Sequence, residues 1–299
     1  MNAAIAWWDR HQVPLYLLAI LCGAALGLSR PGAVPESVLN PLLVALMYAT
    51  FLGLPLTGLH RPDTRFLAAL SVLNFVLVPA VVYALSRPIA QDHPTLVGVL
   101  LVLLAPCVDY VLVFSGLAGA AREKLLAATP LLMALQMLLL PVYLRVFAPQ
   151  AQEVIRPGPF AQAFLLLIVL PLLAAALTQR TPAAARARVA SEACMVPLMV
   201  LTLAAVATQI PASFPLRVIP LYVAFLLLMA PIGALVGRVF RQDIPTTRAL
   251  VFSGATRNSL VVLPLALTVP GAAAVVVAQT LVELVGMVAY IRLIPRWLR

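Results

Sequence analysis

The feature that most constrains this chain is a succession of apolar stretches, most of them long enough to cross a lipid bilayer. Crossing about 30 Å of hydrocarbon takes about 20 apolar residues in a helix. Turn residues and charges separate apolar segments at residues 13–29, 38–59, 66–86, 96–118, 124–147, 159–179, 191–210, 217–237, 246–268 and 271–294. The sequence therefore predicts an all-α integral membrane protein of ten spanning helices, forming one polytopic domain over residues 1–299.

Composition supports a membrane protein and argues against a soluble one. Hydrophobic residues make up 63% of the chain and charged residues only 10%, and the mean hydropathy is +1.06. So few charges cannot cover the surface of a soluble globule. The net charge of +10 does not indicate nucleic-acid binding, because the basic residues stand in ones to threes between apolar stretches and form no basic stripe.

The positions of the basic residues predict the orientation. Fourteen of the 20 Lys and Arg residues lie at the N-terminus, in the even-numbered connections or at the C-terminal end, whereas five lie in the odd-numbered connections and Arg257 lies inside a span. Cytoplasmic loops carry the excess of Lys and Arg. We therefore expect a multi-pass protein of the cell (inner) membrane with both termini in the cytoplasm. The connection from Gln179 to Arg188 is the longest on the cytoplasmic side and is predicted to lie at the membrane interface.

An internal repeat emerges when the fifth span is laid over the tenth. At an ungapped offset of 147 residues, Gln136 falls on Glu283, Tyr143 on Tyr290 and Arg145 on Arg292. This gives repeat one at about 13–147 and repeat two at about 159–294. Five helices per repeat is an odd number, so the two repeats would be inverted relative to each other, a plan common among secondary transporters.

The repeat also aligns two places where a helix is expected to break. Span four carries Pro106, and span nine carries the run from Ser253 to Asn258 at the corresponding place. Interrupted helices that cross near the midplane present half-helix ends to solutes and ions. The alternative is that Pro and Gly are simply common in membrane helices. We predict interrupted, crossing helices four and nine.

Three ionisable residues lie deep within spans. Asp109 and Arg257 fall one residue apart at the two aligned breaks and are predicted to form an ion pair, in either a structural or a gating role. Glu283 has Gln136, not a charge, at its repeat position. A carboxyl without a charged partner in hydrocarbon favours its protonated form and can carry a proton. Glu283 is therefore the candidate proton-coupling residue, the alternative being a structural hydrogen bond to a neighbouring helix.

Cysteine positions add a second candidate group. Cys107 follows Pro106 at the predicted break, where a solute would pass, and a thiolate there would bind a thiophilic species. Cys22 and Cys194 are expected to be inert apolar residues. With Cys107, the predicted solute-contacting residues are Asp109, Ser253, Thr256, Arg257 and Asn258.

The segment from Ala105 to Glu123 resembles helix four of the arsenical-resistance efflux permeases, members of the bile acid/arsenite/riboflavin transporter superfamily. The motif begins at Cys107, reaches Leu-Ala at Leu117 and Ala118, and ends at Arg122 and Glu123. The tenth-helix glutamate of that family matches Glu283. The chain departs from the usual pattern at Ser115-Gly116 and at Gly119-Ala120-Ala121, and Asp109 and Arg257 are not typical of the main family, so it resembles a divergent branch.

This resemblance implies efflux of trivalent arsenite or antimonite in exchange for protons, with Cys107 engaging the metalloid and Glu283 the proton. The resemblance to the sister branch of bile acid and organic-anion symporters implies an alternative, transport of a small organic anion. Sodium ligands of that branch fall on Ser253 and Arg257, and a fixed cation at position 257 is hard to reconcile with sodium there.

Other classes of protein find less support in the sequence. An intramembrane hydrolase would need a zinc motif, a Ser/His pair or paired aspartates, and a channel would show a repeated pore motif with a ring of charges. Neither pattern is present. We expect no enzymatic activity, no cofactor or metal, and no nucleic-acid or obligatory protein partner. The expected partners are a small solute and the lipid bilayer, with the proton as coupling ion.

Overall fold

The computed structural model describes residues 34–53, 63–108, 110–150, 157–208 and 215–299, together with scattered residues between Trp7 and Arg30. This part of the chain is helical, and its elements follow one another as α2 (Glu36–Gly53), α3 (Thr64–Val72), η1 (Leu73–Leu77), α4 (Val78–Ser86), η2 (Arg87–Ile89), α5 (His93–Leu103), α6 (Tyr110–Leu117), α7 (Arg122–Phe147), α8 (Pro157–Phe164), η4 (Leu165–Val169), α9 (Leu170–Thr178), α10 (Ala184–Ala207), η5 (Leu216–Val218), α11 (Ile219–Val239), α12 (Ile244–Ala255), α13 (Ser259–Leu267) and α14 (Ala272–Trp297). The first predicted span, 13–29, is described only in part, and its described residues are helical.

Five helical runs among the described residues are long and apolar enough to cross a membrane: Thr64–Ile89, Arg122–Phe147, Ala161–Thr178, Leu216–Val239 and Ala272–Trp297. Shorter apolar helices occupy the segments Ser37–Gly53, His93–Leu103 and Ala193–Thr202. The length and apolar composition of these helices indicate a multi-pass membrane protein. Predicted spans four and nine are absent from the long runs because each is divided into two short helices, α5 with α6 and α12 with α13.

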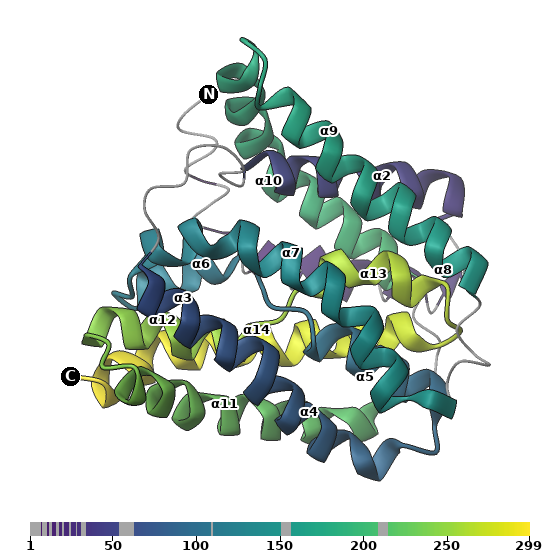
Figure 1. The fold of residues 1–299 in the computed structure, drawn as a ribbon. Helices are drawn as coiled ribbons and strands as arrows, with labels where there is room; N and C mark the ends of the chain where they lie inside the picture. The colour runs from purple at the N-terminus through teal and green to yellow at the C-terminus, as the bar shows by residue number, and fades with distance from the viewer. Residues whose placement is uncertain are drawn as a thin grey trace.

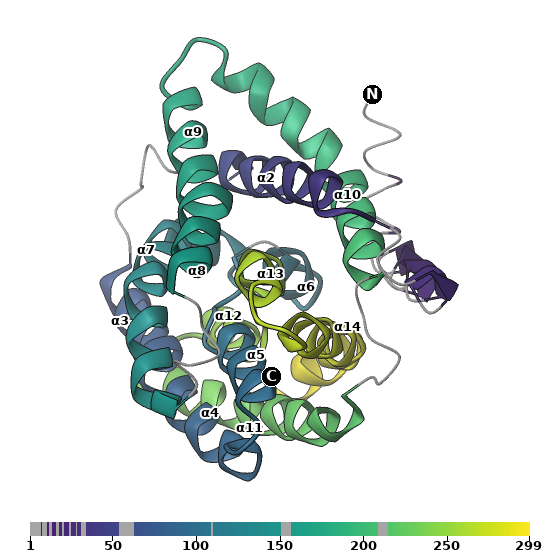
Figure 2. The same ribbon diagram turned by 90° about the vertical axis from the view of Figure 1, so that its right-hand side faces the viewer.

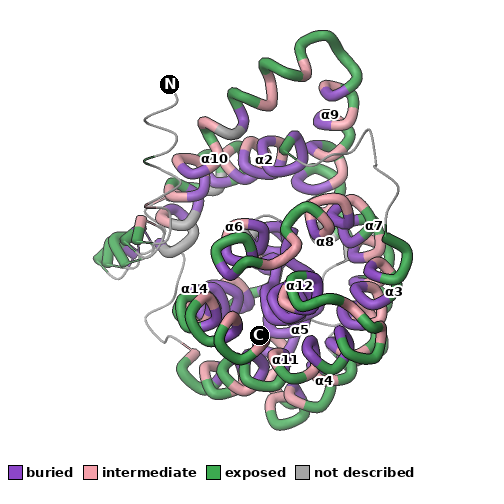
Figure 3. The backbone as a smooth tube through the Cα atoms, turned by 90° about the vertical axis from the view of Figure 1, so that its left-hand side faces the viewer, coloured by how far each residue is buried: buried purple, intermediate pink, exposed green. Residues whose placement is uncertain are grey.

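The helices form two groups (Figure 1). The smaller group holds α2, the continuous run α8–η4–α9, and α10, with α2 lying between α9 and α10 (Figure 2). The larger group holds α3 to α7 and α11 to α14. At its centre lie α5 and α12, most of whose residues beyond the first turn are buried (Figure 3). The two interrupted helices thus form the core of the larger group.

Aspartates at helix starts explain where several helices begin. Asp63 accepts a hydrogen bond from Phe66 N at the start of α3. Asp92 accepts from Thr95 N and Asp243 from Thr246 N, and proline follows within the first turn of both helices. An aspartate N-cap followed by proline favours a helix start, because it satisfies an N–H group without an intrahelical partner and presets φ. The sequence therefore determines the entry into α5 and α12 locally.

The connection from Gln179 to Arg188, predicted to lie at the membrane interface, is shorter than expected. Helix α10 already begins at Ala184. Arg188 lies in its first turns and donates to Gln179 Oε1 at 3.2 Å, while Gln179 Nε2 donates to the carbonyl of Leu52 at 3.1 Å. These contacts tie the turn between α9 and α10 to the end of α2. A helix can begin among arginines because their charged ends reach out of the apolar layer.

Close packing of α11 against α12 depends on glycine. A Cβ atom added at Gly233 would lie 2.7 Å from Val251 Cα. We expect Gly233→Ala to push α11 and α12 apart, at a cost of about 1–3 kcal/mol in the free energy of unfolding. Thermal unfolding of purified protein measures this cost. The control is Gly53→Ala, where an added Cβ meets nothing within 4 Å. Equal melting temperatures for both variants would contradict the close contact.

The salt bridge at the start of α3 predicts a small dependence of stability on pH. Lys124 Nζ lies 2.8 Å from Asp63 Oδ2, and this hydrogen bond, with that from Phe66 N, holds the pKa of the Asp63 carboxyl below its ordinary value. A lowered folded-state pKa stabilises the fold above the unfolded pKa, and this stability is lost as pH falls through the folded pKa. Because the pair is exposed, we expect Asp63→Asn to lower the melting temperature by only about 1 °C at neutral pH. The difference should vanish below that pKa, and a loss that persists there would instead indicate an effect of the amide on the helix cap.

Candidate functional site

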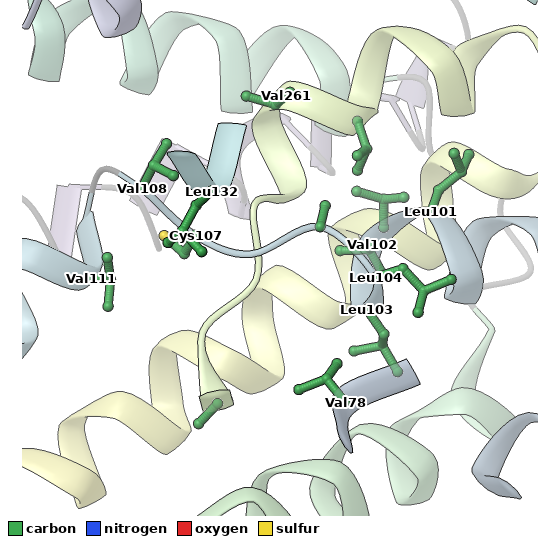
Figure 4. Packing of buried hydrophobic residues seen from close by; sticks show 14 of the residues in the cluster. Val78, Leu101, Val102, Leu103, Leu104, Cys107, Val108, Val111, Leu132 and Val261 are labelled. Atoms are coloured by element: carbon green, nitrogen blue, oxygen red, sulfur yellow. The ribbon is translucent and has the colours of Figure 1, made fainter. Parts of the chain in front are cut away.

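The candidate site lies where the breaks of the two interrupted helices meet. The chain leaves α5 after Leu103 and re-enters a helix at Tyr110, and it leaves α12 after Ala255 and re-enters at Ser259. Between these points the two segments run antiparallel as an isolated bridge between Pro106 and Arg257. The predicted interruption and crossing of helices four and nine are therefore present (Figure 4).

Backbone hydrogen bonds hold the crossing together. Asn258 N–H donates to the carbonyl of Ala105 at 2.8 Å, and Cys107 N–H donates to the carbonyl of Thr256 at 3.4 Å. Each break leaves backbone groups without an intrahelical partner inside the apolar core, where an unpaired polar group costs several kcal/mol. Each segment supplies the partners that the other lacks, so neither break can exist in this form alone.

Arg257 is the most enclosed charge of the described chain. Its side chain is fully buried, and its guanidinium donates from Nη2 to the carbonyls of Ser253 and Gly254, at 2.5 and 2.7 Å, and to Asn74 Oδ1 at 3.0 Å. Nη1 donates to the carbonyl of Leu103 at 3.3 Å. The guanidinium also lies 5.6 Å from the ring centre of Phe225, within the range of a cation–π contact.

Asn74 on η1 is a member of this site that the sequence analysis missed. Its Nδ2 donates to the carbonyl of Leu70 and to Ser253 Oγ, both at 3.1 Å. These two acceptors fix the orientation of the amide, so that Oδ1 faces Arg257. The π-helical segment that carries Asn74 is a kind of irregularity frequent at functional sites. The available signal was an asparagine within the otherwise apolar span 66–86.

Glu283 on α14 is joined to the same crossing. Its Oε2 accepts from the backbone N–H of Arg257 at 2.9 Å and from Gln279 Nε2 one helical turn earlier, and its side chain is 1% exposed. The sequence analysis considered only a charged partner for Glu283, and the structure adds these two hydrogen bonds. Gln279 was not predicted, although its spacing of four residues places it on the same helix face as Glu283.

Three of the other predicted residues have structural contacts at the break. Ser253 Oγ accepts from Asn74, Thr256 Oγ1 donates to the carbonyl of Phe252 at 2.8 Å, and Asn258 Oδ1 accepts from Val261 N at 3.2 Å to cap α13. Asp109 lies outside the described residues, and so does its predicted ion pair with Arg257. Two ion pairs of the described residues, Lys124–Asp63 and Arg217–Asp92, lie at helix ends.

Cys107 occupies the break itself. It is 1% exposed and belongs to the apolar cluster drawn in Figure 4. The backbone N–H of Cys107 donates to the carbonyl of Thr256. Arg257, which follows Thr256 in the chain, donates its own backbone N–H to Glu283 Oε2. Cys107, which carries the predicted thiol, and Glu283, the predicted proton carrier, therefore bond to two consecutive residues of the second break, Thr256 and Arg257.

A cavity of about 1000 Å³ lies between the two helix groups. Its walls come from α2, from α8–η4–α9, and from α13 with the start of α14, and include Asn40, Tyr48, Gln162, Pro264 and Thr268. Most of the lining side chains are apolar. The site residues predicted from the sequence are not among the residues that line this cavity.

Comparison with known proteins identifies the family. The sequence model of the sodium bile acid symporter family matches residues 40–214, which is more than half of the chain. The chain belongs to this family. The match covers the first break with Cys107 and ends before the second, and a search of curated proteins found no match. For this member of the sodium bile acid symporter family, a transporter is therefore favoured over an enzyme.

Proposed function

We propose that this symporter-family protein is a secondary active transporter of ten spans in the cell (inner) membrane, built from two inverted five-helix repeats, with both termini in the cytoplasm. The proposal rests on family membership, on the five long apolar runs and on the crossing of two interrupted helices. In such architectures the solute and its coupling ion bind near the midplane, at half-helix ends.

Equivalent contacts in the two halves support the repeat. Asp92 and Asp243 cap α5 and α12 in the same way, each accepting from the N–H three residues on. Tyr143 of α7 donates its hydroxyl to the carbonyl of Phe75, and Tyr290 of α14 donates to the carbonyl of Leu226. Each acceptor lies on the helix that precedes the interrupted one, and α7 and α14 both contain 26 residues.

The transported solute is, in our proposal, a trivalent metalloid, arsenite or antimonite, and the observation that carries this is the thiol of Cys107 at the crossing. Arsenous acid is uncharged at neutral pH and reacts with thiols. The thiol displaces one hydroxyl group, so that one S–As bond forms and one water leaves, and hydrolysis reverses the step. Three thiols would hold the metalloid too tightly for release, whereas one thiol holds it transiently.

Glu283 supplies the coupling in this proposal. A buried carboxyl can take up and release a proton, and Oε2 of Glu283 accepts hydrogen bonds from the N–H of Arg257 and from Gln279. Glu283 accepts a hydrogen bond from the backbone N–H of Arg257, and the preceding residue, Thr256, pairs with Cys107. Protonation of Glu283 would weaken this hydrogen bond and so allow the backbone at the break to shift. Proton entry would then drive export of the metalloid.

Transport in everted vesicles tests this proposal. Respiration acidifies the lumen of such vesicles, and an exporter that exchanges solute for protons should then accumulate arsenite inside. We expect accumulation that a protonophore abolishes and that vesicles without the protein do not show. Folded protein without gradient-dependent accumulation would refute metalloid exchange.

The cavity between the two helix groups favours a second candidate, a small organic anion with an apolar body. A volume of about 1000 Å³ lined mostly by apolar side chains far exceeds what arsenite needs. Uptake of taurocholate by intact cells, measured in sodium and in choline medium, distinguishes the two candidates. Taurocholate uptake without arsenite accumulation would favour the organic anion, and the reverse result would favour the metalloid.

A further inference from the structure

The oxygen atoms around Arg257 form the kind of cage that binds a free alkali cation. The breaks in α5 and α12 redirect three N–H groups that would otherwise continue the helices: Cys107 bonds to Thr256, Arg257 to Glu283, and Asn258 to Ala105. In an unbroken helix these N–H groups would bond to the carbonyls four residues earlier. The carbonyls released in this way are those of Leu103, Ser253 and Gly254.

The guanidinium of Arg257 contacts these same three carbonyls and also the amide oxygen of Asn74. Leu103 ends α5, and Ser253 and Gly254 lie in the last turn of α12, so two helix C-termini converge on one point. A helix C-terminus carries a partial negative charge. The crossing therefore creates a buried focus of negative potential that requires a cation.

More oxygen atoms surround Nη2 of Arg257 than this nitrogen has hydrogen atoms to donate. Nη2 carries two hydrogens, yet three oxygens lie within 3.0 Å of it. At least one of these contacts is thus a charge–dipole attraction or a shared hydrogen bond. Carbonyl and amide oxygens gathered around a point charge are typical of alkali-cation sites in transport proteins.

We propose that Arg257 is a tethered cation, whose guanidinium fills a monovalent-cation site made by the crossing and Asn74. The protein therefore takes up no sodium ion at this site, although its family is named for sodium symport. Removing the side chain opens the cage to a free cation. This inference holds whichever solute the protein carries.

Thermal unfolding of the purified full-length protein in lipid nanodiscs tests the proposal, with sodium chloride exchanged for choline chloride at constant ionic strength. We expect wild-type protein to melt at the same temperature in both salts. Arg257→Ala should melt lower in choline and gain roughly 5 °C or more in about 100 mM sodium, because a ligand that binds only the folded state raises its melting temperature.

Arg257→Lys is the matched control, since it keeps a tethered positive charge and should show no response to sodium. Folded Arg257→Ala that responds to neither lithium, sodium nor potassium would overturn the proposal. So would sodium-dependent stabilisation of the wild type that Asn74→Leu removes, because the site would then accept sodium beside the arginine.

Chemical rescue decides the case in which Arg257→Ala fails to fold. Membranes that contain this variant are then extracted in buffer with millimolar guanidinium or with sodium. Recovery of monodisperse protein with either cation supports a cage that needs only a cation. Failure of both to recover any folded protein would overturn the proposal, since it would show that the arginine stem, rather than its charge, holds the site.

Discussion

Replacing Cys107 with serine will reduce arsenite accumulation in everted vesicles to the level of vesicles without the protein. Serine keeps the size and hydrogen-bonding geometry of cysteine, but its hydroxyl lacks the affinity of sulfur for trivalent arsenic. The buried position adds a small penalty of about 1–2 kcal/mol in stability for the more polar group. The loss should therefore appear in transport far more than in the amount of folded protein.

The other two cysteines are matched controls for this substitution. Cys22 and Cys194 are exposed on the protein, whereas Cys107 is buried at the crossing. Cys22→Ser and Cys194→Ser should transport at the native rate. If Cys107→Ser also transports at the native rate, the metalloid does not bind through this thiol. If one of the exposed cysteines proves necessary instead, the solute path lies away from the crossing.

Replacing Glu283 with glutamine will abolish arsenite accumulation driven by the proton gradient but will preserve arsenite exchange in the absence of a gradient. We expect accumulation driven by the proton gradient to fall to background, because an amide cannot take up and release the proton. Exchange of labelled for unlabelled arsenite across vesicles without a gradient should persist, because Cys107 is intact. The two assays on the same vesicles therefore give opposite results for one variant.

The surroundings of Glu283 allow this substitution without loss of the fold. The amide oxygen of the new glutamine can still accept from the backbone N–H of Arg257. Gln279 can rotate its own amide, whose Oε1 has no hydrogen-bond partner among the described residues, to accept from the new NH2 group. Glu123→Gln, at an exposed position at the start of α7, is the control and should behave like wild type. Native gradient-driven accumulation in Glu283→Gln would contradict a coupling role.

The sequence was informative wherever a polar residue or a helix breaker interrupts an apolar run. Pro106 and the polar run from Ser253 to Asn258 predicted both breaks, and Glu283 was identified as an ionisable residue deep within a span, where it is indeed buried. Such residues are costly in hydrocarbon and so mark places where the structure must compensate. Their positions alone, however, did not reveal their partners.

What the sequence could not show depends on contacts between distant segments. The pairing of Arg257 with carbonyls of α5 and α12 uses backbone atoms, which carry no sequence signal. Asn74 reaches this site from another helix, and its role follows from the orientation of its amide rather than from its spacing. The cavity likewise arises from the placement of the two helix groups, and apolar residues on α2 and α13 give no sign of it.

The backbone pairing at the crossing also sets an order for assembly in the membrane. Ala105 and Cys107 are made early in synthesis, but their partners, Asn258 and Thr256, follow only after most of the remaining chain. Until the second break is synthesised, the first half must reside in the bilayer with its helix interrupted, while the carbonyl of Ala105 and the N–H of Cys107 lack these two partners. Chains that terminate between the two breaks should therefore be recognised by quality-control proteases, however apolar their helices are.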